Sequence, residues 1–254
     1  MDTTAYVGEV IAGFVYLFVG VRLFRLSQRT GHVPEALIAA SFLLWTLCYA
    51  IWDIPYAFVE SEELVPPFYS YASLFALASG NALFAFFICA VFRRDSRWAR
   101  WLAIAIAVSL FAGLAGTAWV GDWEGTDPLA NPWYWLDGFG AYAPCIWMGA
   151  EGFAHYSRAR RRLKLGLCEP MACNRFLLWG LAGSLWAILE AIVTASDLVY
   201  AYTGQWSESL GFGIALFEIV PMLIVSLAFF PPDFYRRWVE GGASTPAEGA
   251  PPAN

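Results

Sequence analysis

Charged residues are scarce in this chain. Asp, Glu, Lys and Arg make up 14% of its 254 residues, whereas hydrophobic residues make up 59%. An ordinary soluble domain carries about 25% charged residues, because its surface must face water. The scarcity of charge therefore excludes an ordinary soluble domain and predicts a membrane protein.

Histidine and cysteine are also few. The chain has 2 histidines and 5 cysteines. Two histidines far apart in the sequence exclude a multi-histidine metal site, and the spacing of Cys168 and Cys173 is not a zinc pattern. No cysteine is placed for an extracellular disulfide. We therefore expect no metal and no other cofactor.

Seven apolar stretches are long enough to cross a bilayer as helices, which takes about 20 residues each. They cover residues 5–24, 36–59, 68–92, 98–120, 133–156, 176–202 and 210–230. The predicted fold class is all-α, an integral membrane bundle of seven transmembrane helices.

The basic residues indicate how this bundle is oriented. All 15 Lys and Arg residues fall in alternate connections: after the first, third and seventh stretches, and between the fifth and sixth. Cationic connections stay in the cytoplasm. The amino terminus is therefore predicted outside and the carboxyl terminus in the cytoplasm, in a multi-pass protein of the plasma or inner membrane.

The end of the chain differs from the rest. Residues 239–254 are rich in Gly, Ala and Pro and show no hydrophobic periodicity. Such a composition is typical of disordered segments. We expect one transmembrane domain over residues 1–238 and a disordered cytoplasmic tail over residues 239–254.

Four of the carboxylates inside the predicted spans are candidates for a site: Asp53 near Pro55, Glu190 and Asp197 in the sixth span, and Glu218 in the seventh. A charged group at mid-membrane costs roughly 3 kcal/mol on insertion scales, so it is usually paired, hydrated or functional. Glu190 and Asp197 are seven residues apart and share a helix face. Asp53, Glu190 and Glu218 reach a similar depth, so these four acids are the predicted ligand-binding or proton-exchanging residues.

Three carboxylates at one depth cannot all ionise in a low dielectric, so at least one should hold a proton at neutral pH. Such a group can exchange its proton for a cation or donate a hydrogen bond to a polar headgroup. The structural alternative is that the protonated acids only form hydrogen bonds between helices.

A second group of polar residues lies at the cytoplasmic end of the fifth span. Glu151 and His155 are spaced i, i+4 and share a face, which suggests a secondary proton path or an internal pair. The basic run that follows is explained by orientation and lipid headgroups, and a cytoplasmic partner could also dock there. This run contains Arg158, Arg160, Arg161 and Arg162.

Seven spans with an outside amino terminus resemble the topology of microbial rhodopsins and G-protein-coupled receptors. Retinal pigments need a Schiff-base lysine in the seventh helix, but the only lysine here is Lys164, in a cytoplasmic connection. Retinal bound as a Schiff base is therefore excluded. The receptor motifs DRY and NPxxY are also absent.

The last two spans resemble the fungal RTA1-like family of seven-span lipid-translocating exporters. The resemblance rests on Glu190 in LEA, Glu208 before the seventh span, EIVPM at residues 218–222, and Pro231 at the end of that span. The family usually has His-Pro-Gly at its last motif, where this chain has Phe-Pro-Pro-Asp. The resemblance covers about a quarter of the chain and implies a shared architecture more than a shared substrate.

Three functions fit these observations. The first is a transporter or flippase for a small amphipathic or cationic molecule, with membrane lipids around it and homo-oligomers possible. The second is a receptor or sensor that signals through a cytoplasmic partner. An intramembrane carboxylate-metal enzyme ranks third because histidines are so few. We expect no nucleic-acid partner.

Overall fold

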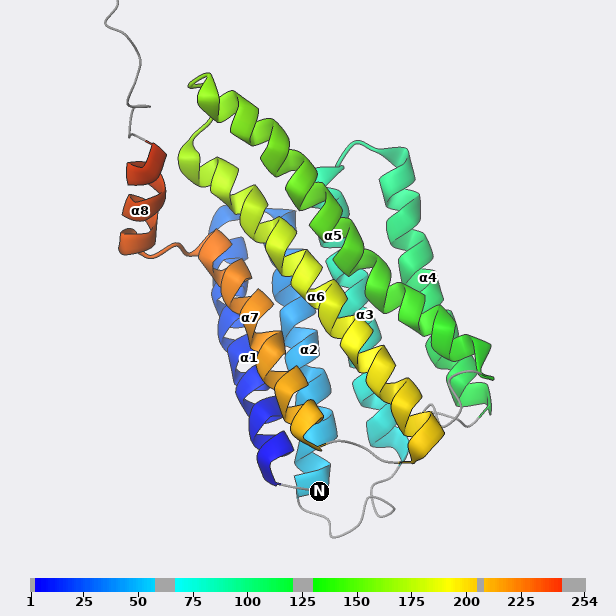
Figure 1. The fold of residues 1–254 in the computed structure, drawn as a ribbon. Coiled ribbons are helices and arrows are strands. Elements are labelled where there is room, and N and C mark those ends of the chain that lie inside the picture. Colours follow the sequence, from blue (N-terminus) through cyan, green and yellow to red (C-terminus); the bar gives the residue numbers. More distant parts are fainter. Residues whose placement is uncertain (1–2, 58–66, 121–129, 205–207, 244–254) are drawn as a thin grey trace, which may run out of the picture.

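The structure, a computed structural model, describes residues 3–57, 67–120, 130–204 and 208–243, and in these ranges it is entirely α-helical apart from short connections. The helices form one elongated bundle (Figure 1). Their bounds are α1 Thr3–Thr30, α2 Val33–Ala57, α3 Pro67–Phe92, α4 Arg97–Val120, α5 Pro132–Lys164, α6 Pro170–Thr203, α7 Glu208–Phe229 and α8 Asp233–Ala243.

The seven predicted spans correspond to α1 through α7. Among the described residues, six helices are long and apolar enough to cross a membrane, namely α1, α2, α3, α4, α6 and α7. The protein is therefore a multi-pass membrane protein. Helix α5 has the length of a span but a less apolar composition, because it contains Asp137, Glu151 and the basic run at its end.

From α1 to α7 each helix packs against the next, and α7 also packs against α1, whereas α8 contacts α6. The helices α1 to α7 thus form a closed arrangement in which α3 also contacts α5. This closure leaves an interior that is enclosed by helices, and the polar groups described below face that interior.

Helices α5 and α6 approach each other most closely, through glycine. A Cβ atom on Gly152 would lie 2.3 Å from the backbone nitrogen of Gly180, and one on Gly183 would lie 2.4 Å from that of Gly149. Small residues four or fewer positions apart allow helix backbones to touch in membranes, where packing rather than the hydrophobic effect holds helices together. The α5–α6 pair is therefore a rigid part of the bundle.

Helix α8 is a feature that the hydropathy pattern does not predict. Phe234 and Trp238 are 68% and 71% exposed, and Tyr235 accepts a hydrogen bond of 2.8 Å from Asn174 on α6. Aromatic residues on one side of a short helix and charges on the other are typical of helices lying in the membrane interface. The expected domain boundary at residue 238 falls inside α8, and residues 244–254 of the expected tail lie outside the described residues.

Candidate functional site

Glu218, near the middle of α7, accepts hydrogen bonds from tyrosines on two other helices. The hydroxyl of Tyr16 on α1 donates to Oε1 over 2.6 Å, and the hydroxyl of Tyr49 on α2 donates to Oε2. The two tyrosine rings stack with centroids 6.0 Å apart. A tyrosine hydroxyl is a neutral donor, so it satisfies a carboxylate oxygen without cancelling a charge. The helices α1, α2 and α7 therefore meet at an acidic group that has no counter-ion among these contacts.

Glu218 borders a cavity of about 340 Å³, which we call the glutamate cavity. Three acids and four large aromatic residues give this cavity its chemical character. The lining consists of Glu9, Glu190, Glu218, Tyr16, Trp45, Tyr49 and Trp186, with Cys48, Ser73, Leu74, Leu77, Asn81, Cys145 and Leu189 between them. An acidic cavity with aromatic walls is suited to a cation, which the negative faces of aromatic rings also attract.

A second cavity of about 340 Å³, the aspartate cavity, adjoins the first. The two cavities share Leu74, Leu77, Asn81 and Glu190 in their linings. Asp137 on α5 and Asp197 on α6 provide its other acids. The hydroxyl of Tyr134 donates a hydrogen bond of 2.8 Å to Oδ2 of Asp197. The acidic space in the bundle is therefore elongated, with Glu190 between its two parts.

Glu190 differs from Glu218 in that it has no hydrogen bond or ion pair with any residue that the structure describes. It lies inside the bundle, and the surface that its side chain retains lines the two cavities. Glu218, Asp137 and Asp197 are all within its electrostatic reach. An acid in this position needs a cation or a proton, because an isolated buried carboxylate is costly.

Neither cavity has a Lys, Arg or His among the described residues that line it. Five acids, Glu9, Asp137, Glu190, Asp197 and Glu218, therefore share this space without a basic side chain. Buried acids that serve only packing are normally paired or hydrogen-bonded. The unbalanced charge distinguishes this part of the bundle from the rest.

The structure brings together three of the four candidate acids named from the sequence. Glu190 and Glu218 line one cavity, and Asp197 shares the adjoining cavity with Glu190, in agreement with their seven-residue spacing. Asp53 lies in the last turns of α2, but its side chain lies outside the described residues. Its place in the cavity stays a prediction.

An aromatic layer closes one side of the glutamate cavity, toward the end of the bundle where α2 begins and α3 ends. Phe42 and Phe84 are completely buried and lie against Trp45 and Trp186, with ring centroids 5.3 Å apart for Phe42 and Trp45 and 5.4 Å apart for Phe84 and Trp186. Phe84 in turn stacks on Phe87 at 6.1 Å. Aromatic rings at these distances attract each other beyond their burial. Five rings thus lie between the acidic cavities and that end of the bundle.

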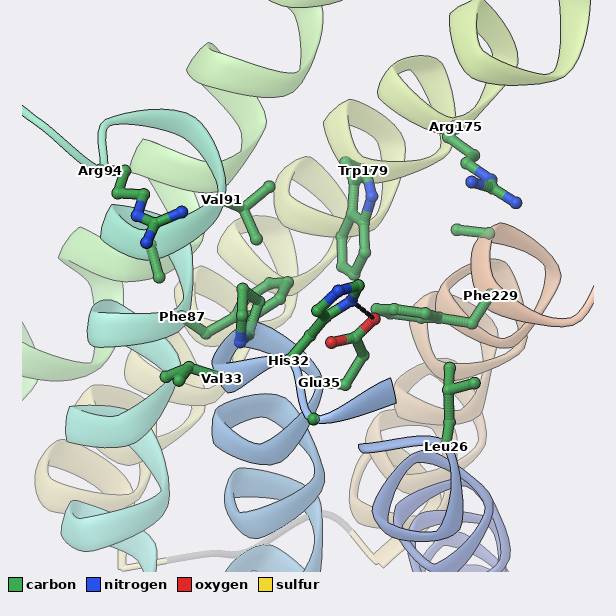
Figure 2. A pocket seen from close by; sticks show the side chains of 14 residues that line it. Leu26, His32, Val33, Glu35, Phe87, Val91, Arg94, Arg175, Trp179 and Phe229 are labelled. Carbon is green, nitrogen blue, oxygen red and sulfur yellow. Dashed lines mark hydrogen bonds and ion pairs between the residues drawn. The ribbon is translucent and has the colours of Figure 1, made fainter. Parts of the chain in front are cut away.

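Beyond this layer lies a larger cavity of about 880 Å³, the arginine cavity. Figure 2 shows Arg94 and Arg175 on opposite sides of it, with the ion pair of His32 and Glu35 between them. The side chains of Phe87, Trp179 and Phe229 form part of its wall, and the rings of Phe87 and Trp179 lie 5.2 Å apart. The same aromatic contacts that end the glutamate cavity therefore begin the arginine cavity. The remaining lining residues are Leu26, Gly31, Val33, Pro34, Ala90, Val91 and Ala228.

Glu151 and His155 lie apart from all three cavities. Oε1 of Glu151 forms an ion pair of 2.7 Å with Nε of Arg93, and this bond raises the pKa of the Arg93 guanidinium. The ring of His155 lies between Phe92 and Phe176, and its Nδ1 is 3.5 Å from Oε2 of Glu151. This pairing ties α5 to the end of α3. The proposed proton path through Glu151 and His155 stays a prediction.

Several residues of the site were not expected from the sequence. The sequence does not distinguish the tyrosines that donate hydrogen bonds to these acids, Tyr16, Tyr49 and Tyr134, from tyrosines that lie at a membrane interface or only pack between helices. Asp137 could have been found, because it lies in the apolar stretch 133–156 and has the same membrane cost as the other acids. Trp45 on α2 donates a hydrogen bond of 3.1 Å to Oδ1 of Asn81 on α3, which links these two helices.

Comparison with protein-family models, with curated proteins and with solved structures finds no match to this chain. The resemblance to RTA1-like exporters therefore stays a prediction. Within the described residues there is also no group of three or more His, Cys, Asp or Glu side chains arranged to hold a metal ion. The site must be interpreted from its own geometry.

Proposed function

We propose that this protein binds a small cationic or amphipathic molecule in the glutamate cavity and moves it across the membrane. In this proposal α5 also crosses the bilayer, giving seven spans with the amino terminus outside. The observation that carries the proposal is the cavity of about 340 Å³ in which Glu190 and Glu218 face aromatic walls without a basic side chain.

The cavity's chemistry favours an organic cation. An ammonium group placed there meets the acids Glu190 and Glu218 and the rings of Trp45 and Trp186. Each cation–π contact contributes about 0.5–2 kcal/mol, with the larger values in desolvated sites. Glu218 is already held in place by Tyr16 and Tyr49, so little ordering of this acid is needed when a ligand binds.

The arginine cavity, on the other side of the aromatic layer from the glutamate cavity, favours transport over simple binding. The glutamate cavity and the arginine cavity are separated by rings that contact one another in sequence, from Trp186 through Phe84 and Phe87 to Trp179. A transporter alternates access to a central site from the two membrane faces. Movement of these rings would join the two cavities and give such a path.

The test uses the full chain in detergent or in liposomes, with benzylammonium as the cation and benzyl alcohol as its uncharged counterpart. We expect benzylammonium to bind and the alcohol not to bind, as measured by titration calorimetry. Glu218→Gln should weaken binding at least about tenfold, which is a loss of about 1.4 kcal/mol. Liposomes containing the wild-type protein should take up labelled benzylammonium faster than empty liposomes.

Glu35→Gln is the matched control, because Glu35 is an acid of the arginine cavity and does not line the glutamate cavity. It should leave benzylammonium affinity unchanged. Equal binding of the cation and the alcohol, or equal affinity in Glu218→Gln and wild type, would contradict the proposal. Binding without uptake would remove the transport step and leave a binding protein.

A receptor or sensor is the second candidate, and the length of α5 and α6 favours it. At 33 and 34 residues, these helices are about 50 Å long, against a hydrocarbon core of about 30 Å. Figure 1 shows the α5–α6 pair projecting beyond α1, α2 and α7. Exposed Arg158, Arg160, Arg161 and Arg162 lie on that projection, where an acidic cytoplasmic partner could bind. Replacing Arg160, Arg161 and Arg162 by Gln should abolish copurification of such a partner and leave benzylammonium uptake intact.

A further inference from the structure

We infer that the ligand is an elongated molecule with two positive charges, such as a linear diamine, which occupies the glutamate and aspartate cavities together. The inference rests on the proposed function, because it assigns the cation class that the same site selects. The inference adds a second position that binds a positive charge, whereas a cation with a single charge needs only one such position.

The shape of the acidic space matches a chain with two ends. The two cavities have the same volume, about 340 Å³ each, and they meet at Leu74, Leu77, Asn81 and Glu190. Leu74 and Leu77 provide an apolar wall at the junction, which suits a hydrocarbon linker. A ligand with one compact charge would fill only one cavity and leave the other acids unmatched.

Each cavity has its own acids. Glu218 is confined to the glutamate cavity, whereas Asp137 and Asp197 are confined to the aspartate cavity. Asp137 has no hydrogen bond or ion pair with any residue that the structure describes, and the same is true of Glu190 between the cavities. Two such acids, enclosed by helices and facing a continuous space, call for more than one positive charge.

The spacing of the acids sets the length of the ligand. Glu190 and Asp197 are seven residues apart on α6, which places them about 10 Å apart along the helix axis. Glu190 borders both cavities and Asp197 borders only the aspartate cavity, so this spacing measures the distance from the junction into the aspartate cavity. A diamine with a chain of about this length can place an ammonium group in each cavity. A diamine with a much shorter chain cannot reach both cavities at once.

The test compares octylamine with the octane diamine, which have the same chain and differ only in the second ammonium group. Both compete with benzylammonium for the purified full-length protein in detergent, and titration calorimetry gives their affinities. Joining two bound groups in one ligand strengthens binding well beyond either group alone. We expect the diamine to bind at least about tenfold more tightly than the monoamine, and more tightly than the butane diamine.

Asp197→Asn separates this inference from the proposed function. It should reduce diamine affinity to near that of the monoamine and change monoamine and benzylammonium affinity by a much smaller factor, and the retained benzylammonium binding also shows that the variant is folded. Glu35→Gln should leave the affinities for the diamine, the monoamine and benzylammonium unchanged. If the wild type binds benzylammonium but binds the monoamine and the diamine with equal affinity, the two-charge inference is wrong and the proposed function still stands. No binding of any of the three amines would overturn the proposed function.

Discussion

Acids inside the bundle have different partners in its two regions. At the end that contains Arg93, the side chain of Glu151 is 7% exposed and its Oε1 lies 2.7 Å from Nε of Arg93, and Oε1 of Glu35 lies 3.3 Å from Nδ1 of His32. In the acidic cavities, Glu190 has no partner among the described residues, and Glu218 contacts only neutral tyrosine hydroxyls. A glutamate is thus balanced by an arginine in one region, and in the other it lies without a basic partner among the described residues.

This difference separates structural acids from candidate functional acids. In an ion pair such as Arg93–Glu151 the charges balance without a ligand, and removing one partner leaves a buried charge. The acids of the two cavities are incomplete until a cation or proton arrives. Exposure alone does not make this distinction, because both sets of acids lie inside the bundle.

The largest expected effect comes from breaking the complete pair. Arg93→Met leaves Glu151 buried with His155 as its remaining partner among the described residues, and we expect a loss of about 2–3 kcal/mol in stability. This is below the value for a fully buried pair, because the Arg93 side chain is 33% exposed. The measurement is the thermal unfolding midpoint of the ligand-free protein in detergent.

Two further variants sharpen this prediction. Arg94→Met changes the next residue, which is exposed and has no acidic partner among the described residues, and should alter stability by less than about 0.5 kcal/mol. The double variant Arg93→Met, Glu151→Met removes both charges and should recover most of the loss. Equal midpoints for Arg93→Met and Arg94→Met would show that the ion pair is not structural.

The smaller expected effect is opposite in sign. Glu190→Gln removes an acid that has no partner and lies near Glu218, Asp137 and Asp197, so the ligand-free protein should gain about 1 kcal/mol. Glu218→Gln should increase the stability of the ligand-free protein by less, because two tyrosine hydroxyls already stabilise that carboxylate. The same unfolding measurement applies. A loss of stability in Glu190→Gln as large as in Arg93→Met would place Glu190 among the structural acids.

Hydropathy predicted the bundle because long apolar runs have few alternatives in a bilayer, where backbone groups must bond within a helix. It missed α8, which is too short and too amphipathic to produce such a run. It also overlooked Asp137, which is close to the tryptophan and tyrosine residues at the start of α5. The acids Glu190, Asp197 and Glu218 were predictable because each interrupts an apolar run.

What the sequence determined by itself is the membrane class, the positions of the long helices and three of the acids in the cavities. These follow from composition and spacing along one chain. Only the tertiary structure decided that Tyr16 and Tyr49 hold Glu218, that Glu190 faces two cavities, and that Arg93 neutralises Glu151. Those facts depend on how the helices are rotated about their axes, and rotation is set by side-chain packing between helices that are distant in the sequence.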